Sequence, residues 1–288
     1  MSPLKKEELI NILPKDGPTV KETIKYLDKY NEDFIVIKMG GSVFSNKILF
    51  NNLIEDIAIL KKLGLSIFLI HGGGTKISSK LNELNITSNF VNGLRVTDDK
   101  TINIVEDVLI EFNKEIVNAL KNQSCKAKRI TSKEYNVITV EQENDILGFV
   151  GSPTHIKTNI LTEIVKANEV PVIASLGLDK NNQTFNINAD TAAGSIAKEL
   201  NARRLLILSD VEGVLNKDKK LVSEINLEQA KKMIDEGVIS GGMIPKINNC
   251  LDVAKNGVKA VCILDGRKNH SILFELLSDK GSGTLIRE

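Results

Sequence analysis

The sequence has almost no net charge. Its 38 Lys and Arg residues stand against 37 Asp and Glu residues, which leaves +1 at pH 7. This balance supplies no field across the chain that would hold a polyanion or an anionic membrane surface, so nucleic acid is not expected as a partner. Proline is scarce, with six residues, and 42% of the chain is hydrophobic, which excludes the disordered, collagen-like and low-complexity classes. An ordinary globular protein is the class that remains.

Cysteine and long hydrophobic runs are also scarce. Cys125, Cys250 and Cys262 are far apart and odd in number, which is typical of a reducing compartment rather than a disulfide framework. We expect them to be buried small hydrophobic residues. No apolar run approaches the ~20 residues of a membrane span, and the start of the chain lacks the apolar stretch of a signal peptide. We therefore expect a soluble, cytoplasmic protein without a membrane partner.

Two common nucleotide-binding fingerprints are missing. No glycine is followed by lysine, so there is no Walker phosphate loop, and no Gly-x-Gly triplet is completed by a glycine three residues later. Glycines instead open or precede helical segments in three stretches, Gly40–Gly41, Gly72–Gly74 and Gly241–Gly242. Such turns let backbone N–H groups approach anionic oxygens, so together they indicate a polyanionic ligand or two anions. A tight strand-to-helix turn explains any single one more simply.

Short β-branched runs alternate with longer segments of helical period, which is typical of an α/β fold. Because the runs are apolar on both faces, we expect a largely parallel sheet covered by helices on both sides, with ligands outside the carboxyl ends of its strands. The expected strands are Phe34–Lys38, Ser66–Ile70, Asn136–Val140, Pro171–Ser175, Arg204–Leu208 and Val258–Leu264.

A helical appendage is expected before the first strand. Thr19 and Glu22 form a capping-box pattern, and Val20, Ile24 and Leu27 follow at helical spacing. This apolar stripe must be buried against its own domain or against another subunit, and the sequence leaves both open.

Two lysines flank the glycine stretches. Lys38 precedes the first and Lys246 follows the last, while Asn186–Asp190 places short polar residues before a predicted helix, Thr191–Leu200. Two ammonium groups near phosphate-sized anion holes, with a carboxylate to orient them, are what phosphoryl transfer requires. Asp190 could instead, or in addition, cap its helix.

These motifs resemble those of the amino acid kinase superfamily and, within it, of the acetylglutamate kinase family, over residues 17–288. Each block is weak alone, but their order and spacing are specific. The blocks are Val36–Gly41, Ile70–Gly74, Phe90–Asp98, Asn186–Asp190, Leu208–Leu215, Gly241–Lys246 and Asp265–Arg267. The resemblance implies a three-layer αβα sandwich with a central, mainly parallel sheet. It also implies a helical appendage (1–33), an acceptor-binding lobe (34–176) and a nucleotide-binding lobe (177–288), with the sheet continuous across both lobes.

The resemblance further implies transfer of the γ-phosphoryl group of ATP to the side-chain carboxylate of N-acetyl-L-glutamate, a step of arginine biosynthesis. Mg²⁺ would be carried mainly by the nucleotide phosphates, with no dedicated metal site in the protein. An acceptor carboxylate with a pKa near ~4.3 is already ionised at neutral pH, so no general base is needed and the scarcity of histidine is no objection. His71 could pack or donate within its glycine loop, whereas His155 and His270 are expected at the surface or in packing.

The family's residue roles carry over by position. Lys38 and Lys246 resemble the lysines that bind the phosphoryl group in flight and the leaving β-phosphate, and Asp190 resembles the carboxylate that orients them. The implied donors around the acceptor and the transferred group are Gly41, Gly73 and Gly74, and the residues that grip the acceptor's α-carboxylate are Arg95 and Asn186. The implied ATP-binding residues are Asp210, Val211, Glu212, Gly213, Val214, Leu215, Val238, Ile239 and Ser240.

Two other functions stay open. A kinase for acetylaminoadipate or its carrier-linked form, from lysine biosynthesis, would need a basic groove, which Lys126, Lys128, Arg129 and Lys133 could form, although a solvated face explains them more simply. A non-catalytic arginine-sensing subunit is disfavoured by the retained lysines and carboxylate. The stretch 126–135 is glycine-free where the family has a glycine-rich loop, so the outer hairpin of the acceptor lobe is expected to differ in shape.

Regulation is implied by both ends of the chain. In arginine-inhibited members of the family, an N-terminal helix joins dimers into a hexamer, and arginine binds beside that helix against the C-terminal segment. The matching parts here imply a homohexamer, a trimer of dimers, inhibited by L-arginine at Tyr26, Glu275, Gly281 and Gly283. Glu275 would pair with the guanidinium, and the glycine turn would present carbonyl groups. A PII-type signalling protein is a further partner that the resemblance leaves open.

Overall fold

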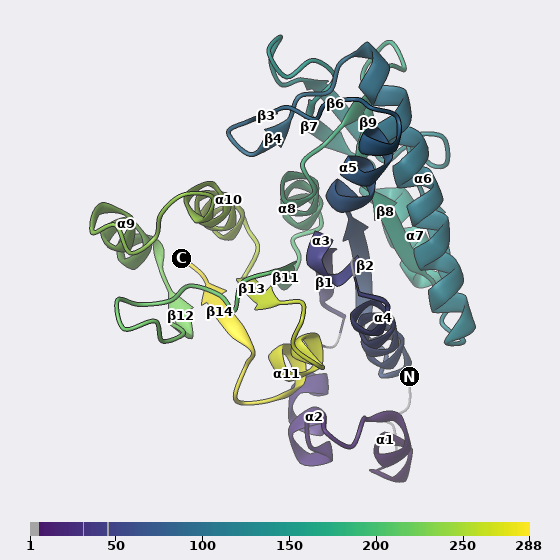
Figure 1. The fold of residues 1–288 in the computed structure, drawn as a ribbon. Helices are drawn as coiled ribbons and strands as arrows, with labels where there is room; N and C mark the ends of the chain where they lie inside the picture. Colours follow the sequence, from purple (N-terminus) through teal and green to yellow (C-terminus); the bar gives the residue numbers. More distant parts are fainter. Residues whose placement is uncertain (1–5, 31, 45) are drawn as a thin grey trace.

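An eight-stranded sheet forms the centre of the protein (Figure 1). The computed structural model describes residues 6–30, 32–44 and 46–288, so residues 1–5 and 31 of the expected appendage lie outside the described residues. The strand order is β12-β14-β13-β11-β1-β2-β8-β5, and every neighbouring pair is parallel except β13 and β14, which confirms the mainly parallel sheet. The strands are β1 (Phe34–Met39), β2 (Ser66–His71), β5 (Ala127–Ile130), β8 (Val170–Ala174), β11 (Arg204–Ser209), β12 (Glu224–Ile225), β13 (Val261–Asp265) and β14 (Gly283–Ile286).

Helices cover both faces of this sheet. Successive side chains of a strand point to opposite faces, so Val36 of β1 packs with Ile196 on one side, while Ile37 packs with Ile57 on the other. The first face carries α7 (Thr158–Lys166), α8 (Ala189–Glu199), α9 (Leu227–Asp235) and α10 (Met243–Lys255), and the second carries α4 (Lys47–Lys62), α6 (Asp99–Asn122) and α11 (Ser271–Leu277). The expected three-layer sandwich is confirmed.

Two smaller sheets extend the sandwich at the carboxyl ends of β2 and β8. One is four-stranded, in the order β10 (Thr184–Asn186), β9 (Leu176–Leu178), β6 (Ile138–Gln142) and β7 (Gly151–Ile156), and the other is the hairpin of β3 (Phe90–Val91) and β4 (Leu94–Arg95). The run Asn136–Val140, expected in the main sheet, belongs to the four-stranded sheet as β6. That placement was wrong because β6 pairs antiparallel with β7 and leaves Glu141 and Gln142 exposed, unlike a strand buried on both faces.

The glycine-free stretch 126–135 contributes β5, which pairs with β8 at the edge of the main sheet. Beyond β5 the chain turns back, with the N–H of Thr131 donating to the carbonyl of Glu134. The three cysteines are buried and unpaired, as expected. Within the described ranges, no helix is both long enough and apolar enough to cross a membrane.

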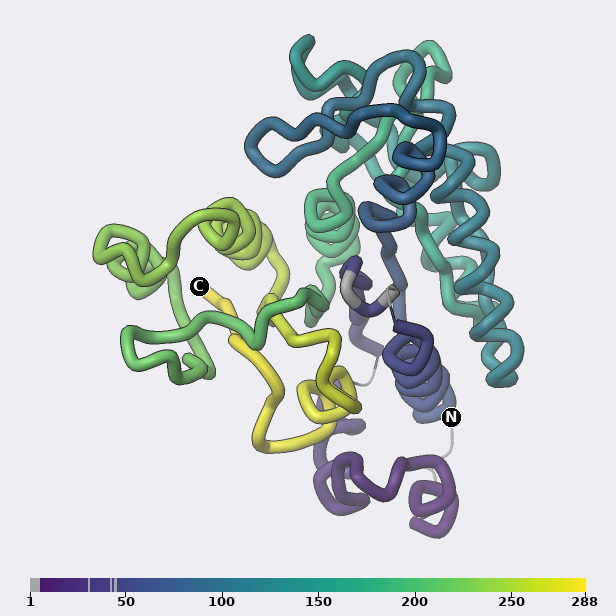
Figure 2. The backbone as a smooth tube through the Cα atoms, viewed as in Figure 1, coloured from purple at the N-terminus to yellow at the C-terminus, as the bar shows by residue number. Residues whose placement is uncertain are grey.

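The N-terminal appendage lies beside the C-terminal helix of the same chain (Figure 2). It contains α1 (Lys6–Ile12) and α2 (Val20–Leu27), and the capping box is confirmed because the N–H of Glu22 donates to Thr19 Oγ1 while the N–H of Thr19 donates to the Glu22 carboxylate. Helix α2 packs on α11, and Val20 and Leu27 contact the core. Ile24 of the expected stripe is 44% exposed. Packing within the chain therefore covers only part of the stripe.

Candidate active site

Two lysines from distant parts of the chain meet on one carboxylate. Lys38 lies near the end of β1, Asp190 in the first turn of α8 and Lys246 in the first turn of α10. The Nζ of Lys38 is 2.7 Å from Asp190 Oδ1, and the Nζ of Lys246 donates to Asp190 Oδ2. Burial would raise the pKa of Asp190, but the two ammonium groups outweigh it and lower the pKa from 3.8 to about 2. Asp190 is therefore ionised at neutral pH.

Asn188, not Asp190, caps helix α8. Its Oδ1 accepts hydrogen bonds from the N–H groups of Asp190 (2.9 Å) and Thr191 (3.2 Å), and the helix begins at Ala189. The cap role that the sequence left open for Asp190 falls to Asn188, and the Asp190 carboxylate contacts the two lysines. Asn249 of α10 donates to the backbone carbonyl of Asp190 at 3.2 Å and ties the start of α8 to α10.

The glycine turns after β1 and β2 face each other next to Lys38. Gly41 begins the short helix α3 (Gly41–Phe44), and a Cβ atom there would lie 3.3 Å from Thr75 Oγ1 of α5 (Gly74–Glu83). A Cβ atom on Gly40 would lie 2.3 Å from the carbonyl oxygen of Leu208, so only glycine fits against β11. A hollow of about 520 Å³ is lined by both turns together with Lys38 and Arg95.

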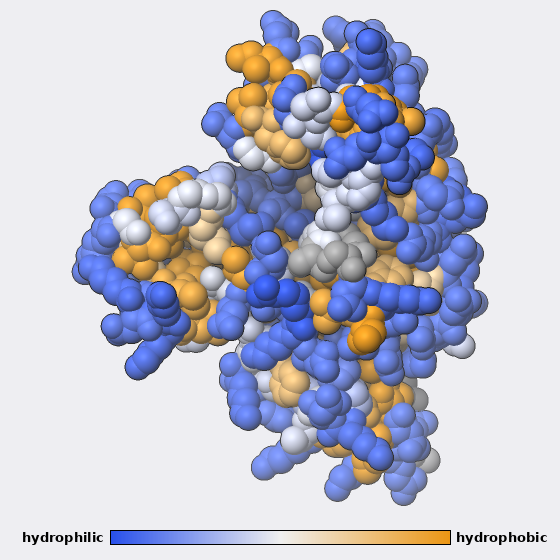
Figure 3. All heavy atoms as spheres, in the orientation of Figure 1, coloured by the Kyte–Doolittle hydropathy of each residue, from blue (hydrophilic) through white to orange (hydrophobic). Residues whose placement is uncertain are grey.

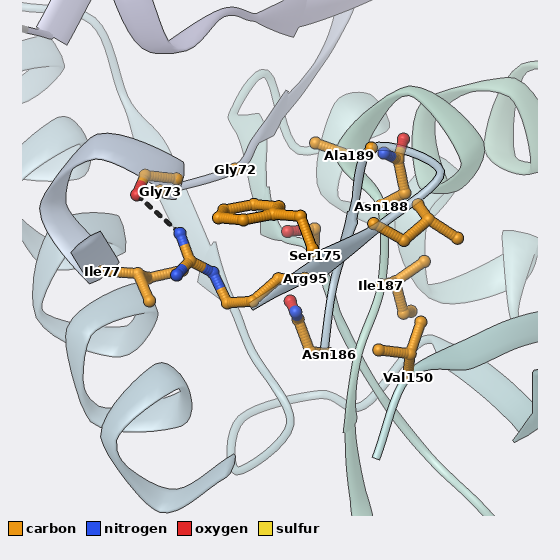
Figure 4. A pocket seen from close by; sticks show the side chains of 14 residues that line it. Gly72, Gly73, Ile77, Arg95, Val150, Ser175, Asn186, Ile187, Asn188 and Ala189 are labelled. Atoms are coloured by element: carbon orange, nitrogen blue, oxygen red, sulfur yellow. Dashed lines mark hydrogen bonds between the residues drawn. The ribbon is translucent and has the colours of Figure 1, made fainter. Parts of the chain in front are cut away.

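Arg95 and Asn186 share a smaller pocket of about 150 Å³ with Gly72–Gly74 (Figure 4). The guanidinium of Arg95 donates to Gly74 O at 3.1 Å, and the Asn186 amide donates to Thr97 Oγ1 at 3.3 Å. The pocket thus combines a cation, an amide and the N-terminus of α5. These groups suit a small ligand that carries a carboxylate.

Further contacts, which sequence reasoning missed, hold Arg95 in place. Its guanidinium donates to Ser88 Oγ at 2.6 Å and to Ser78 Oγ at 2.8 Å, and its central carbon lies 4.7 Å from the centre of the Phe90 ring. No motif in the sequence marks either serine, because a serine on a helix or in a turn is ordinary. Asn188 belongs to the motif Asn186–Asp190, but the sequence alone assigned it no role.

A larger cavity of about 820 Å³ opens on the other side of Asp190. Its lining comes from the tip of the β3–β4 hairpin, the start of α8 and the glycine turn before α10, and it includes Asn92, Lys246 and Gly241. Figure 3 shows a hollow between the part of the molecule that carries α9 and α10 and the part that carries the hairpin, and its lining combines polar residues with apolar ones such as Leu94 and Ile244. Lys38 lines the hollow that Arg95 also lines, and Asp190 and Lys246 line the larger cavity, so the lysine pair connects these two spaces.

The segments expected to bind ATP line none of these cavities. Gly213, at φ +139°, packs against Thr284, whose Oγ1 accepts a hydrogen bond from the N–H of Val214 at 2.8 Å. The side chains of Val214 and Ile239 are buried in the core, while Asp210, Glu212 and Ser240 are exposed. Because the side chains of Val214 and Ile239 are buried, only the backbone groups of these two residues could contact a ligand. The role of both segments in ATP binding stays a prediction.

Of the residues expected to bind arginine, Tyr26 lies on α2, which packs on the helix α11 that carries Glu275, whereas Gly281 follows α11 and Gly283 begins β14. The Tyr26 hydroxyl donates to Asp279 at 2.7 Å. The Glu275 carboxylate accepts from the N–H of Ser282 at 2.9 Å and from the Cys262 thiol at 3.1 Å. A Cβ atom on Gly281 would lie 3.2 Å from Glu275 Oε2, whereas one on Gly283 would lie 2.0 Å from Ile263 O. Gly283 is therefore required by strand packing, whatever its part in a site.

Two of the three histidines are buried with polar partners. His71 has no exposed surface and lies behind the glycine turn. His270 is also buried, and its Nδ1 is 2.6 Å from Asp56 Oδ1, so its ring forms a hydrogen bond with a carboxyl group inside the protein instead of a simple packing contact. In the part of the chain that the structure describes, no group of three or more His, Cys, Asp and Glu residues is arranged to hold a metal ion.

Comparisons with known proteins agree with this geometry. The model of the amino acid kinase family matches residues 33–265. The chain is 72% identical to the acetylglutamate kinase of Pelagibacter ubique (strain HTCC1062) over the full length of both, and 42% identical to that of Ruegeria pomeroyi over 93% of this chain and 94% of the other.

Solved structures show the same fold. A protein of Streptococcus mutans UA159 superimposes with a TM-score of 0.76 at 30% identity, over 88% of this chain and 98% of the other. The N-acetylglutamate synthase of Neisseria gonorrhoeae, in complex with coenzyme A and N-acetyl-glutamate, has a TM-score of 0.84 at 23% identity, and the match covers 93% of this chain and 62% of the synthase. This chain belongs to the amino acid kinase family and, within it, to the acetylglutamate kinases.

Proposed function

We propose that this chain transfers the γ-phosphoryl group of ATP to the side-chain carboxylate of N-acetyl-L-glutamate, in the cytoplasm, as a step of arginine biosynthesis. The observation that carries the proposal is that Lys38 and Lys246 meet on Asp190, where Lys38 lines a hollow together with Arg95 while Lys246 and Asp190 line a larger cavity. The identity to curated acetylglutamate kinases supports it independently.

The acceptor needs no base. Its carboxylate is ionised at neutral pH, so an oxygen of that carboxylate attacks the γ-phosphorus while the bond to the β–γ bridging oxygen breaks and ADP leaves. Catalysis then consists of positioning and of neutralising charge on the transferring group. Lys38 and Lys246 supply two positive charges, and Asp190 holds both ammonium groups in place while it remains ionised. Gly41, Gly73 and Gly74 would add backbone donors.

The nucleotide would bring its own metal ion. Both oxygens of Asp190 already contact ammonium groups, so the donor set at this point suits Mg²⁺ carried on the phosphates and water better than Mg²⁺ held by protein carboxylates. When bound, the ion would neutralise part of the phosphate charge. We assign the adenosine to the segments Asp210–Leu215 and Val238–Ser240, and with it the nucleotide lobe to residues 177–288 and the acceptor lobe to residues 34–176.

The acceptor's α-carboxylate would bind at Arg95. Three donor contacts of its guanidinium are used within the protein, and a guanidinium has five N–H donors in a planar fork, so two remain for a ligand. Asn186 lines the same pocket and offers its amide. The fixed guanidinium loses little side-chain entropy when the acceptor binds.

The experiment is a coupled assay of ADP release, run with acetylglutamate and with acetylaminoadipate in parallel. We expect turnover with acetylglutamate and much weaker turnover with the longer acceptor, because the pocket is small. Faster turnover with acetylaminoadipate would favour the kinase of lysine biosynthesis. No ADP release with either acceptor, together with arginine binding, would favour the arginine-sensing subunit.

We further propose a hexamer inhibited by L-arginine. The support is the proximity of Tyr26 to the C-terminal segment that contains Glu275, and the exposed Ile24 on α2. Replacing Ile24 by Glu should leave a dimer that arginine no longer inhibits, while Lys21→Glu on the same helix, where the side chain is exposed, should leave the assembly intact. Light scattering and the rate at millimolar arginine measure both effects. A full-length dimer that is insensitive to arginine would refute the regulatory proposal and leave the kinase assignment intact.

A further inference from the structure

His71 is a buried polar residue that the mechanism above does not use. It ends β2, directly before the turn Gly72–Gly74, and it lines neither the acceptor pocket nor the hollow beside it. Its Nδ1 is 3.0 Å from the carbonyl oxygen of Gly72, and its Nε2 is 3.0 Å from the amide nitrogen of Asn113 on α6. The ring of Phe112 packs edge-on against it at 5.2 Å.

These two partners fix the proton on the ring. A carbonyl oxygen can only accept, so Nδ1 must carry hydrogen, and an amide NH₂ can only donate, so Nε2 must be bare. The amide orientation of Asn113 is itself determined, because its nitrogen also donates to Val172 O at 2.9 Å, where the amide oxygen would be repelled. Burial lowers the pKa of His71 to about 4, which agrees with a neutral ring at physiological pH.

The carbonyl that His71 holds belongs to the same peptide plane as the N–H of Gly73. In a planar trans peptide the C=O and N–H bonds point in opposite directions, and the described residues contain no cis peptide. A Gly72 carbonyl held toward the buried ring therefore directs the N–H of Gly73 away from it. Gly73 lines both the acceptor pocket and the adjoining hollow, and its N–H has no acceptor within the described residues.

We propose that His71 is a positioning residue, which holds the Gly72–Gly73 peptide so that the N–H of Gly73 points at the anionic oxygens of the reacting groups. This inference rests on the proposed kinase function and deepens it. Glycine can rotate its peptide planes at little cost. In a run of three glycines, the orientation of the Gly72–Gly73 peptide therefore has to be fixed by a hydrogen bond to another residue. A flipped peptide would present the Gly72 carbonyl oxygen to an anion and repel it.

A purely structural role and a donor role for His71 predict opposite orders of activity for two substituted variants. His71→Leu nearly preserves the buried volume but removes the donor, whereas His71→Asn leaves a gap but keeps an amide nitrogen at the place of Nδ1. If packing alone matters, the Leu variant should be the more active, because volume-conserving changes are tolerated best. If the donor matters, the Asn variant should be the more active.

The test measures kcat and KM for acetylglutamate and ATP in both variants, with thermal unfolding alongside. We expect kcat to fall about 10²-fold in His71→Leu, as for loss of one oxyanion donor, and less than about tenfold in His71→Asn, with KM for ATP little changed in both. The Asn variant should therefore have the higher kcat, although the Leu variant should be the more stable. A Leu variant as active as the Asn variant overturns the proposal.

Nitrogen-15 NMR of the wild-type ring provides a measurement that does not depend on whether the variants fold. Near pH 7 we expect the neutral tautomer with hydrogen on Nδ1, and either the Nε2–H tautomer or an imidazolium overturns the proposal. Wild-type protein without activity on acetylglutamate would overturn the proposed function and this inference with it. An active wild type with the wrong tautomer, or with the reversed order of variants, would overturn only the role of His71.

Discussion

Replacing Asp190 by Asn is the sharpest test of the lysine pair. The amide has the shape of the carboxylate but no charge, so Lys38 and Lys246 would face each other without an anion between them. The pKa of Asp190 falls from 3.8 to about 2 in the folded protein, and one pKa unit corresponds to about 1.36 kcal/mol. The ionised carboxylate is thus favoured by about 2 kcal/mol, even after the cost of its burial.

We expect two consequences for the Asp190→Asn variant. Without nucleotide, its free energy of unfolding at pH 7 should fall by at least about 2 kcal/mol, since removing one partner leaves buried charges uncompensated. Its kcat should fall about 10²-fold or more, because the two ammonium groups lose their common anchor. The KM for ATP should not rise in proportion, because the phosphates bring negative charge to the same lysines.

A matched control lies on the same two helices. Lys198 of α8 and Asp252 of α10 form an ion pair at 2.8 Å, but the Asp252 side chain is 54% exposed. Asp252→Asn should change stability by less than about 1 kcal/mol and leave kcat unchanged. Urea unfolding and the coupled assay measure both variants. If Asp190→Asn keeps kcat within about threefold of wild type, the proposed part of this carboxylate in orienting the lysines is wrong.

Three further perturbations address other parts of the molecule. Lys246→Met should lower kcat about 10²-fold and raise KM for ATP far less, and a near-normal kcat would remove this lysine from the transition state. Arg95→Ala should raise KM for acetylglutamate at least about tenfold and leave KM for ATP unchanged, and Arg95→Lys should not restore it because a single ammonium cannot replace the planar fork; weakened ATP binding alone would contradict the assignment. The third concerns pH: the hydrogen bond to Asp56 raises the pKa of His270, and burial raises that of Asp56 to about 6 against the opposing effect of His270, with the carboxylates of Asp16 and Glu55 nearby. The folded protein therefore binds these protons more tightly than the unfolded chain, so the share of stability from Asp56 is lost as pH rises from 3.8 to about 6, and the share from His270 is lost as pH rises from 6.5 through its raised pKa. Urea midpoints from pH 5 to 9 should show this fall, and Asp56→Asn should flatten it, because that change removes one titrating group and the carboxylate that raises the pKa of the other.

The main sheet could be predicted where the sequence alone determines burial. In β1, β2, β8, β11 and β13 the apolar residues are buried toward both helix layers and the polar residues lie at or next to the strand ends, so their pattern fits only a central strand. β14 was not expected because it begins at a glycine, and that glycine is required by contact with β13. The run that became β6 has the right composition, but composition does not say which sheet a strand joins.

The candidate site, like the sheet, could be predicted only in part from the sequence, and the start of α8 shows why. The sequence Asn188-Ala189-Asp190 offers two residues that can cap a helix, and local preference hardly separates Asn from Asp. Shifting the cap between them moves the start of the helix by two residues and turns the carboxylate from the lysines to the backbone N–H groups. The choice depends on Lys38 and Lys246, which come from β1 and α10 and whose ammonium groups stabilise the ionised carboxylate more than a cap would. Spacing along the chain identified the participants, but which of the two polar residues, Asn188 or Asp190, met the lysines was decided by contacts made only in the folded protein.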